Sequence, residues 1–487
     1  MNSTSAIDNV KLKWFYGICF GFLAMLCIGI MKENYWIAAL PLILGIVYLS
    51  VFGIDALMFI VVFATPLAIN LNEKGFGTSL SVPSEPLMFG IMILFLLKIM
   101  FEGGFDRRVL YHPVTIAIII NLLWIFITSL TSTMIIVSLK HLMARCWFVI
   151  TFYFLGTQLF REYKNIKRFI WVYVIPLIIV IGYTIIRHAG FSFTETTAHW
   201  VMYPFYNDHT AYAAAIAMFF PVMIGLTRNR NYSLNKRMAS LLVCFIFTIA
   251  IVLSYTRAAW ISLAVALIVY LIFAFRIRFI TVFISFTGLL ILFFAFRSQV
   301  TMKLEKNRHH SSTDFNSHLQ SISNITTDAS NLERINRWNS ALRMFEQKPF
   351  FGWGPGTYQF KYAPYQHSDE MTIISTNAGD RGNSHSEYIG PLAESGVLGA
   401  LTFVLIVVVV IYRGSMLYIR SKDKEIRLIT LGIVLGLVTY FVHGALNNFL
   451  DTDKASVPFW GFIGILTAMD VYHSKRQQDA RTNGEQN

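Results

Sequence analysis

The sequence predicts an all-α polytopic membrane protein with about 12 to 14 transmembrane helices and one long extracytoplasmic loop that contains short amphipathic helices. Three observations support this fold class. Of the 487 residues, 55% are hydrophobic and only 14% are charged, well below the roughly 25% charged residues of soluble domains. The apolar residues form runs long enough to cross a bilayer, and the basic residues concentrate between alternate runs. This composition excludes a soluble globular domain and a disordered chain.

Fourteen apolar segments are candidates for spans, because a helix of about 16 to 20 residues crosses the hydrocarbon core. They cover residues 14–30, 36–53, 56–71, 86–101, 113–130, 134–159, 169–186, 211–226, 238–255, 258–275, 279–296, 397–412, 428–446 and 457–471. Residues 56–71 and 457–471 are among the shortest segments and are alternatively re-entrant or interfacial. The first segment lacks a small-residue cleavage site, so we expect no removed signal peptide.

The distribution of Lys and Arg orients the predicted bundle, because basic residues are retained on the cytoplasmic side. With both termini in the cytoplasm, 22 of the 40 Lys and Arg residues lie in cytoplasmic segments and five in the short outer loops. The net charge of +13 therefore indicates a membrane protein, and we expect no nucleic acid partner. We expect four parts: an N-terminal bundle of about 11 spans (1–296), an extracytoplasmic catalytic loop (297–396), C-terminal transmembrane helices (397–472) and a cytoplasmic tail (473–487).

The long loop is the one large water-exposed segment that the pattern predicts. An amphipathic helix is expected from Ser330 through Glu346, with Trp338, Leu342 and Phe345 on its apolar face. Pro349 ends this helix, and a turn with three glycines follows. Glycines permit close backbone approach, so we expect them to be architectural rather than to bind substrate. The four cysteines lie inside apolar runs without metal-ligand spacing, so we expect no metal site.

Several short motifs in and before this loop resemble the O-antigen ligase and polymerase superfamily. In chain order they are Asn207-Asp208-His209-Thr210-Ala211-Tyr212, Ser254-Tyr255-Thr256-Arg257-Ala258-Ala259-Trp260, Arg334-x-x-x-Trp338, Gly352-x-Gly354-x-Gly356, His385-x-x-Tyr388 and Glu394-x-Gly396. Each motif is short, but their order around one long loop between late spans is specific. The sequence departs from the commoner family form where His385-Ser386-Glu387 replaces His-Asn, which puts the local partner of the histidine in doubt.

The resemblance implies a glycosyltransferase of the bacterial inner membrane, with the long loop in the periplasm. Its donor is a glycan linked to undecaprenyl diphosphate, and members of the family work without a metal or a nucleotide sugar. The acceptor is lipid A-core in ligases and the next repeat unit in polymerases, and the sequence does not separate these two functions. A protein acceptor is a third alternative. A transporter or flippase is a rival from another class, which predicts ionisable groups along a mid-membrane path.

Two residues carry the expected chemistry under this resemblance. Arg257 is assigned to the leaving diphosphate, because a guanidinium binds phosphate oxygens in a fork; the alternative is an interfacial arginine that extends to the membrane surface. His385 is the expected base for the acceptor hydroxyl, because imidazole titrates near neutral pH, although a single loop histidine is usually just solvated. Glu387 is expected to orient the His385 ring or to serve as the base itself.

Four further residues are expected to bind substrate: Arg145, Arg334, Lys140 and His209. Arg145 lies within an apolar segment, where a charge is costly unless it faces a cavity or a partner, so a buried carboxylate is its alternative contact. Lys140 alternatively lies above the membrane, and Arg334 alternatively pairs with Glu333 or Asp328. Two polar residues one helical turn apart near the end of a late span either line the site or bond to neighbouring helices; they are His443 and Asn447.

Overall fold

The structure, a computed structural model, describes residues 3–33, 37, 40–70, 81–277, 329–372, 375 and 382–474. The chain forms two compact units, Met1–Ile60 and Val61–Asn487. The first unit contains helices α1 (Ser3–Met31) and α2 (Leu40–Phe52). Helix α3 (Ile54–Ala64) begins in this unit. All other described elements, and the candidate site, belong to the second unit.

The described residues include ten helices that are long and apolar enough to cross a membrane, which confirms the all-α polytopic fold class. They are Ser84–Glu102 (α4), Pro113–Leu130 (α6), Ile135–Leu159 (α7, the π-helix η4 and α8), Tyr163–Ala189 (α9), His209–Thr227 (α11), Leu234–Leu253 (α12), Arg257–Ala274 (α13), Ile389–Arg420 (α19), Lys424–His443 (α20) and Asp453–His473 (α21 and the π-helix η6). Each corresponds to one of the predicted spans.

The other four predicted spans differ from these ten. Three of them fall on shorter apolar helices: Cys19–Met31 within α1, the 13-residue α2, and Ile54–Leu67, which joins α3 to the 3-10 turn η2 (Thr65–Leu67). The fourth, at residues 279–296, lies outside the described residues. After η2 the chain forms a small antiparallel pair of strands, β1 (Ile69–Asn70) and β2 (Ser81–Val82).

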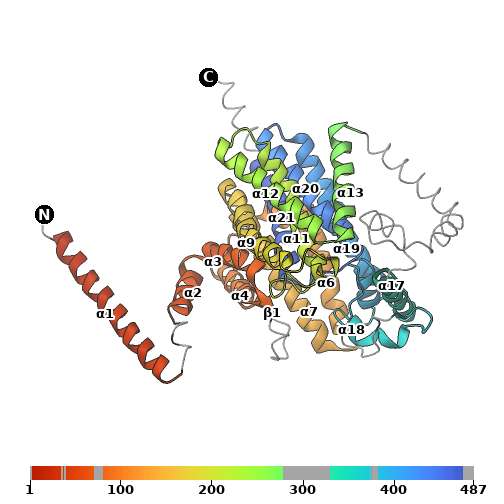
Figure 1. Ribbon diagram of the computed structural model, residues 1–487, viewed down its shortest axis with the longest axis horizontal. Coiled ribbons are helices and arrows are strands. Elements are labelled where there is room, and N and C mark those ends of the chain that lie inside the picture. The colour runs from red at the N-terminus through yellow and green to blue at the C-terminus, as the bar shows by residue number, and fades with distance from the viewer. Residues whose placement is uncertain are drawn as a thin grey trace. The chain divides into compact units, whose positions relative to one another are not determined.

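The centre of the second unit is built from α11, α20 and α21 (Figure 1). More than two thirds of the apolar window of each of these helices is buried, whereas α12 and α13 bury less than a third. Small residues allow the close contact of α11 with α20, because a Cβ added at Gly436 would lie 2.2 Å from the Met218 carbonyl oxygen. Close approach through small residues is a usual way to pack helices in lipid.

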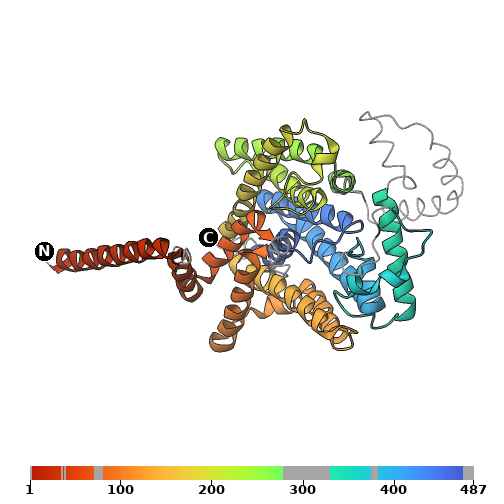
Figure 2. The same cartoon turned by 60° about the horizontal axis from the view of Figure 1, so that its bottom comes forward.

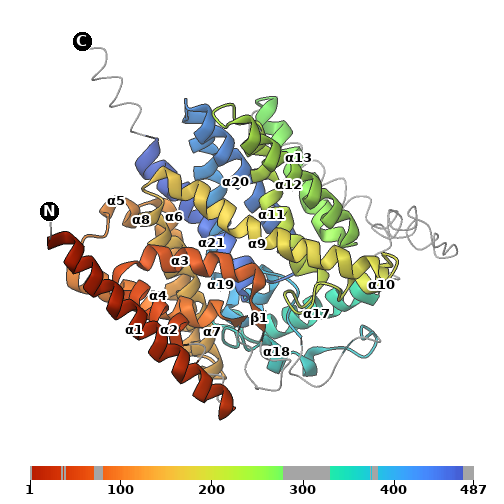
Figure 3. The same ribbon diagram turned by 60° about the vertical axis from the view of Figure 1, so that its left-hand side comes forward.

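The connections alternate between the two ends of this bundle. In Figure 3, the elements α10 (Glu195–Ala198), α17 (Ala329–Gln347) and α18 (Tyr358–Lys361) gather at one end, and α5 (Arg107–Leu110) and α8 (Gly156–Leu159) lie at the other. The predicted topology requires this division, since it places the first group outside and the second inside. Which end faces the cytoplasm stays a prediction.

The described part of the long loop is largely helical. The predicted helix is present as α17, and α18 and the 3-10 turn η5 (Ala363–Tyr365) follow it. The predicted apolar face of α17 is wrong, because Leu342 is 41% exposed while Ala341 and Met344 are fully buried. These two residues pack with Tyr358 and Tyr362 of the same loop. The helix packs mainly against its own loop and the first part of α19 (Figure 2), so small and polar residues form its buried face.

The glycine turn after α17 packs directly against the start of α19. Backbone amides of Trp353 and Gly354 donate hydrogen bonds to the carbonyls of Ala393 (3.0 Å) and Glu394 (2.8 Å). Gly352 has a φ of +68°, and Gly396 has a φ of +69° and interrupts α19. The helix therefore begins at Ile389, before the predicted span, and bends at Gly396. This contact supports the expected architectural role of the glycines.

We predict that Gly352→Ala destabilises the protein, because its Cβ would lie 2.3 Å from the carbonyl carbon of Glu394 and a positive φ costs about 1–3 kcal/mol for a residue with a side chain. The measurement is the thermal unfolding midpoint of the purified protein in detergent. Gly182→Ala in α9 is the matched control: no described atom lies within 4 Å of its added Cβ, and alanine favours a helix. Equal midpoints for the two variants would contradict this packing.

Candidate active site

Five segments that are far apart in sequence meet at the α17 end of the bundle: the starts of α11 and α13, helix α17, residues 382–388, and the 444–452 connection between α20 and α21. Direct hydrogen bonds join them. The Thr256 hydroxyl donates to the His209 carbonyl oxygen at 3.2 Å, and Nε of Arg334 donates to the Leu446 carbonyl oxygen at 3.2 Å. The backbone N–H of Glu387 donates to the Gly444 carbonyl oxygen at 2.8 Å.

His209 is the first residue of α11 and lies near two of the three predicted arginines, Arg257 and Arg334. Asp208 caps this helix, since its Oδ1 accepts hydrogen bonds from the backbone N–H groups of Thr210 (2.7 Å) and Ala211 (2.9 Å). The imidazole rings of His209 and His199 are 4.1 Å apart between centroids. The charges of Arg334 and Arg257 both act on the His209 ring, which brings α13 and α17 to the same place. Its Nδ1 is buried without a hydrogen-bond partner among the described residues.

His385 is held in an unusual backbone conformation near Arg334. Its φ is +49°, and its backbone N–H donates to the Asn383 side-chain oxygen at 3.1 Å. Burial of the ring, followed by the positive charges of Arg334 and Arg337, lowers the pKa of His385 to about 4. The imidazole is therefore neutral at pH 7 and can accept a proton.

The position of α17 depends on a buried ion pair one turn from Arg334. Nε of Arg337 lies 2.6 Å from Oε1 of Glu333, and its guanidinium stands over the Tyr362 ring at 4.2 Å. Burial alone would raise the pKa of Glu333, but hydrogen bonds from Ser375 and Arg337 outweigh it and hold that pKa below its usual value. The ion pair of Glu333 is thus with Arg337; Asp328 lies outside the described residues.

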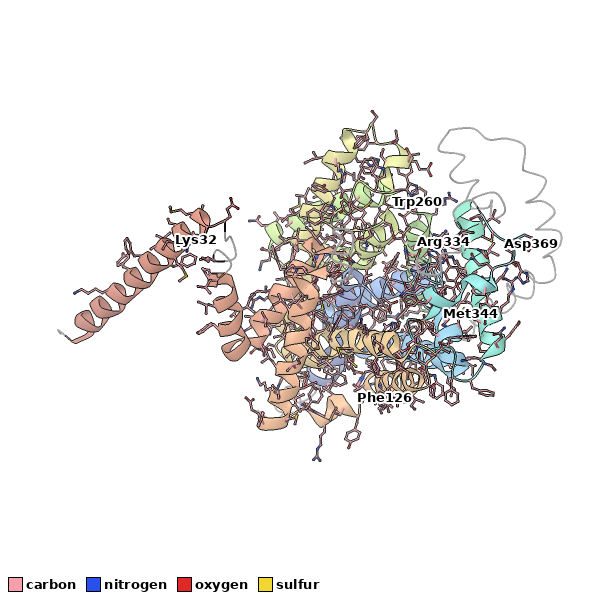
Figure 4. All side chains as sticks on the ribbon, turned by 90° about the horizontal axis from the view of Figure 1, so that it is seen from below. Lys32, Phe126, Trp260, Arg334, Met344 and Asp369 are labelled. Carbon is pink, nitrogen blue, oxygen red and sulfur yellow. The ribbon has the colours of Figure 1, made fainter. Side chains whose placement is uncertain are left out.

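Arg334 projects from α17 toward the bundle, whereas Asp369 lies on the outer side (Figure 4). Its charge acts on His209, His385 and His443, so three imidazoles surround one guanidinium. His443 is buried at the end of α20, and its Nε2 lies 3.2 Å from Nδ2 of Asn447. This contact agrees with a structural role for the His443–Asn447 pair, and it also places the pair beside the cluster. We call His209, Arg257, Arg334 and His385 the catalytic cluster.

Arg145 belongs to a second group of polar residues, which lines a cavity together with Glu387. Its guanidinium lies 3.4 Å from Oδ1 of Asp451, and Nδ1 of His141 lies 3.9 Å from the same oxygen. Arg145 is thus paired with a carboxylate, as its alternative expects, but the Asp451 side chain is 51% exposed and not buried. Arg145 also lines a cavity of about 60 Å³ together with Glu387 and Glu394. It therefore has both of the environments expected for it, a cavity and a carboxylate partner.

Glu387 is buried and its side chain is used to hold the 444–452 connection. Its Oε1 accepts hydrogen bonds at 2.8 Å from the Tyr440 hydroxyl and from the backbone N–H groups of Phe449 and Leu450. Burial, followed by the negative charge of Asp451, raises the pKa of Glu387 to about 7. These three donors fix the segment that carries Leu446, the backbone partner of Arg334.

The structure does not bring Lys140 to either group. Lys140 is exposed on α7, whereas His141 and Arg145, four residues apart, share the face that lines the cavity. That i, i+4 spacing was a signal that could have identified His141. Asp208 and Asp451 were also missed, although each stands in a short polar segment next to a predicted span.

Fold and site together define a polytopic membrane protein whose cationic and imidazole side chains gather at one end of the helical bundle. Residues 242–404 match the family model described as O-antigen ligase, which supports the resemblance to the O-antigen ligase and polymerase superfamily. A search of curated proteins finds no match. The family supports a glycosyltransferase-like function of the O-antigen ligase or polymerase type with lipid-linked glycan substrates. Arg257, Arg334 and His385 lie inside the matched residues, and Arg145 and His209 lie outside them.

Two substitutions of Glu387 separate a base from a positioning residue. We predict that Glu387→Gln retains most activity, because its amide oxygen can accept the same three hydrogen bonds. Glu387→Ala leaves three buried donors unsatisfied, each at a cost of about 1–3 kcal/mol, and should lower both the unfolding midpoint and the transfer rate. Transfer assays and thermal unfolding of both variants test this. If Glu387→Gln is as stable as the wild type but inactive, Glu387 is the base.

Proposed function

We propose that this protein is an O-antigen ligase-like glycosyltransferase that moves a glycan from undecaprenyl diphosphate to lipid A-core on the periplasmic face of the bacterial inner membrane. The observation that supports the proposal is the convergence of Arg257, Arg334 and the neutral imidazole of His385. These residues come from separate segments of the family-matched region. Two fixed cations and one proton acceptor are the groups that transfer from a lipid diphosphate requires.

The proposed reaction begins when the neutral His385 ring takes the proton of the acceptor hydroxyl. The acceptor oxygen then attacks the anomeric carbon of the donor sugar, and the bond from that carbon to the diphosphate oxygen breaks. The electron pair leaves with undecaprenyl diphosphate. Arg257 and Arg334 stabilise the added negative charge, and the start of α13 contributes the positive end of its helix dipole. Attack opposite the leaving group inverts the anomeric centre.

The second polar group is assigned to the acceptor side in this proposal. Arg145 and Asp451 line a cavity together with Glu387, and they supply both a donor and an acceptor of hydrogen bonds. Sugar hydroxyls need both kinds of partner, whereas a diphosphate needs donors only. His209 is assigned to the donor because two arginine charges already converge on its ring.

We predict that His385→Ala lowers the transfer rate by about 10²–10⁴-fold, the usual contribution of a general base. Arg257→Ala should lower it by about 10²–10³-fold, as expected for one charge-stabilising donor. Purified variants are assayed with lipid-linked glycan as donor and with lipid A-core and a second lipid-linked repeat unit as competing acceptors. The exposed residues His367 and Arg230 provide the matched alanine controls.

Wild-type rates in either cluster variant would remove that residue from the mechanism. The acceptor competition tests the ligase assignment separately. Elongation of the second repeat unit, with lipid A-core left unmodified by the active wild-type enzyme, would make the protein a polymerase and would leave the roles of His385 and Arg257 intact.

The pH dependence of kcat/KM reports ionisations of the free enzyme, so we predict that protonation of His385 inhibits the wild type only as the pH falls toward about 4. Arg334→Gln removes the larger of the two cationic charges that lower this pKa. In Arg334→Gln, the pH below which kcat/KM falls should therefore rise toward the ordinary imidazole pKa of about 6.5. An unchanged pH of this fall in Arg334→Gln, at a measurable rate, would show that His385 is not the titrating base.

A further inference from the structure

A second cationic pocket lies at the opposite end of the bundle from the catalytic cluster, between the starts of α9 and α12. Its volume is about 630 Å³, which is within the range of about 300–1,000 Å³ typical of small-molecule sites. Seven residues line it: Lys167, Arg168, Trp171, Asn231, Tyr232, Ser233 and Lys236. We call this cavity the basic pocket. The proposed function assigns no role to it.

The lining of the basic pocket carries three positive charges and, among its described residues, no negative charge. Glu425 stands behind it and holds two of the lining residues in place. Its carboxylate pairs with Lys167, and its Oε2 accepts a hydrogen bond from the Asn231 amide at 3.3 Å. One carboxylate against three cations leaves the pocket positive, so an anion is the ligand that its charge favours.

Aromatic rings position the cations of the pocket. Nζ of Lys167 lies 5.0 Å from the Tyr163 ring centroid and 5.1 Å from that of Tyr232, and Nζ of Lys236 lies 5.9 Å from the Tyr232 ring. Burial, and then the charge of Glu425, raises the pKa of Tyr232 to about 12. The Tyr232 hydroxyl therefore stays protonated and can donate a hydrogen bond. Lysines, an arginine and a phenol are suitable partners for phosphate oxygens.

The surface beside the pocket is apolar and continues along α9. Ile175 and Ile179 follow Trp171 at four-residue intervals on α9 and are exposed. A ligand with a phosphate group and an acyl tail would match both the pocket and this surface, and Trp171 stands at the boundary, where membrane interfaces favour tryptophan.

We propose that the basic pocket binds the phosphate headgroup of an anionic phospholipid, with its acyl chains against the apolar face of α9. The predicted topology places this end at the cytoplasmic leaflet, where basic pockets between transmembrane helices bind anionic headgroups. Free phosphate and a phospholipid headgroup both carry the anionic phosphate group that the pocket would bind. The apolar surface next to the pocket favours the phospholipid as the ligand.

The test measures binding of a fluorescent phosphatidylglycerol to the purified full-length protein in neutral detergent, with a fluorescent phosphatidylcholine and unlabelled inorganic phosphate as separate arms. Arg168→Gln combined with Lys236→Gln should weaken phosphatidylglycerol binding by about tenfold or more, since these are two of the three cations of the pocket. The charge-matched control combines Lys164→Gln and Arg230→Gln, two exposed residues at the same end that do not line the pocket.

Selective loss of phosphatidylglycerol binding in the pocket variant, with an unfolding midpoint equal to the wild type in the absence of lipid, supports the proposal. Lys236→Gln alone gives a milder variant if the double substitution unfolds. Equal binding by the pocket and control variants would overturn it, because attraction would then depend on total charge. Equal affinity for phosphatidylcholine, or displacement of phosphatidylglycerol by inorganic phosphate at millimolar concentration, would also overturn it. None of these measurements depends on transferase activity.

Discussion

The candidate site depends on one constraint of the membrane environment: a backbone N–H or C=O group buried away from water must have a hydrogen-bond partner. The catalytic cluster is built from segments where helices start, stop or bend, so several backbone groups there lie outside regular helix. Buried side chains supply the missing partners. Glu387 accepts from Phe449 and Leu450, and Trp124 donates to the Ser395 carbonyl oxygen at 2.8 Å beside the bend in α19.

The same constraint explains a buried cation that has no place in the catalytic cluster. Nζ of Lys454 donates to the carbonyl oxygens of Thr65 and Ala68, where α3 and η2 end and the chain turns into β1. A lysine there satisfies two carbonyls at once, and the neighbouring carboxylate of Asp453 offsets its charge. The buried Glu387 and Lys454 thus hold irregular backbone in place, whereas the ionisable residues of the catalytic cluster lie close to one another.

The sequence predicts features that depend on neighbouring residues better than contacts between distant ones. Hydropathy located the ten long spans, because the length of an apolar run is a local property. The motif order indicated the family that the match over residues 242–404 supports, and it singled out Arg257, Arg334 and His385. The sequence could not show that Glu387 would contact Phe449 and Leu450, since that contact joins residues more than 60 positions apart. For the same reason the sequence could not show that the fold buries Lys454.

The position of His385 beside Arg334 has a cost and a benefit for the proposed chemistry. Burial and cations hold the pKa of His385 at about 4, and so low a pKa makes the ring a poor proton acceptor at neutral pH. The proposed donor carries a diphosphate, whose negative charges would offset those of Arg334 and Arg257. Binding of such a donor must therefore raise the pKa of His385 toward its ordinary value of about 6.5. The ring becomes an effective base only when the leaving group is in place, which couples deprotonation of the acceptor to the presence of the glycan that it will receive.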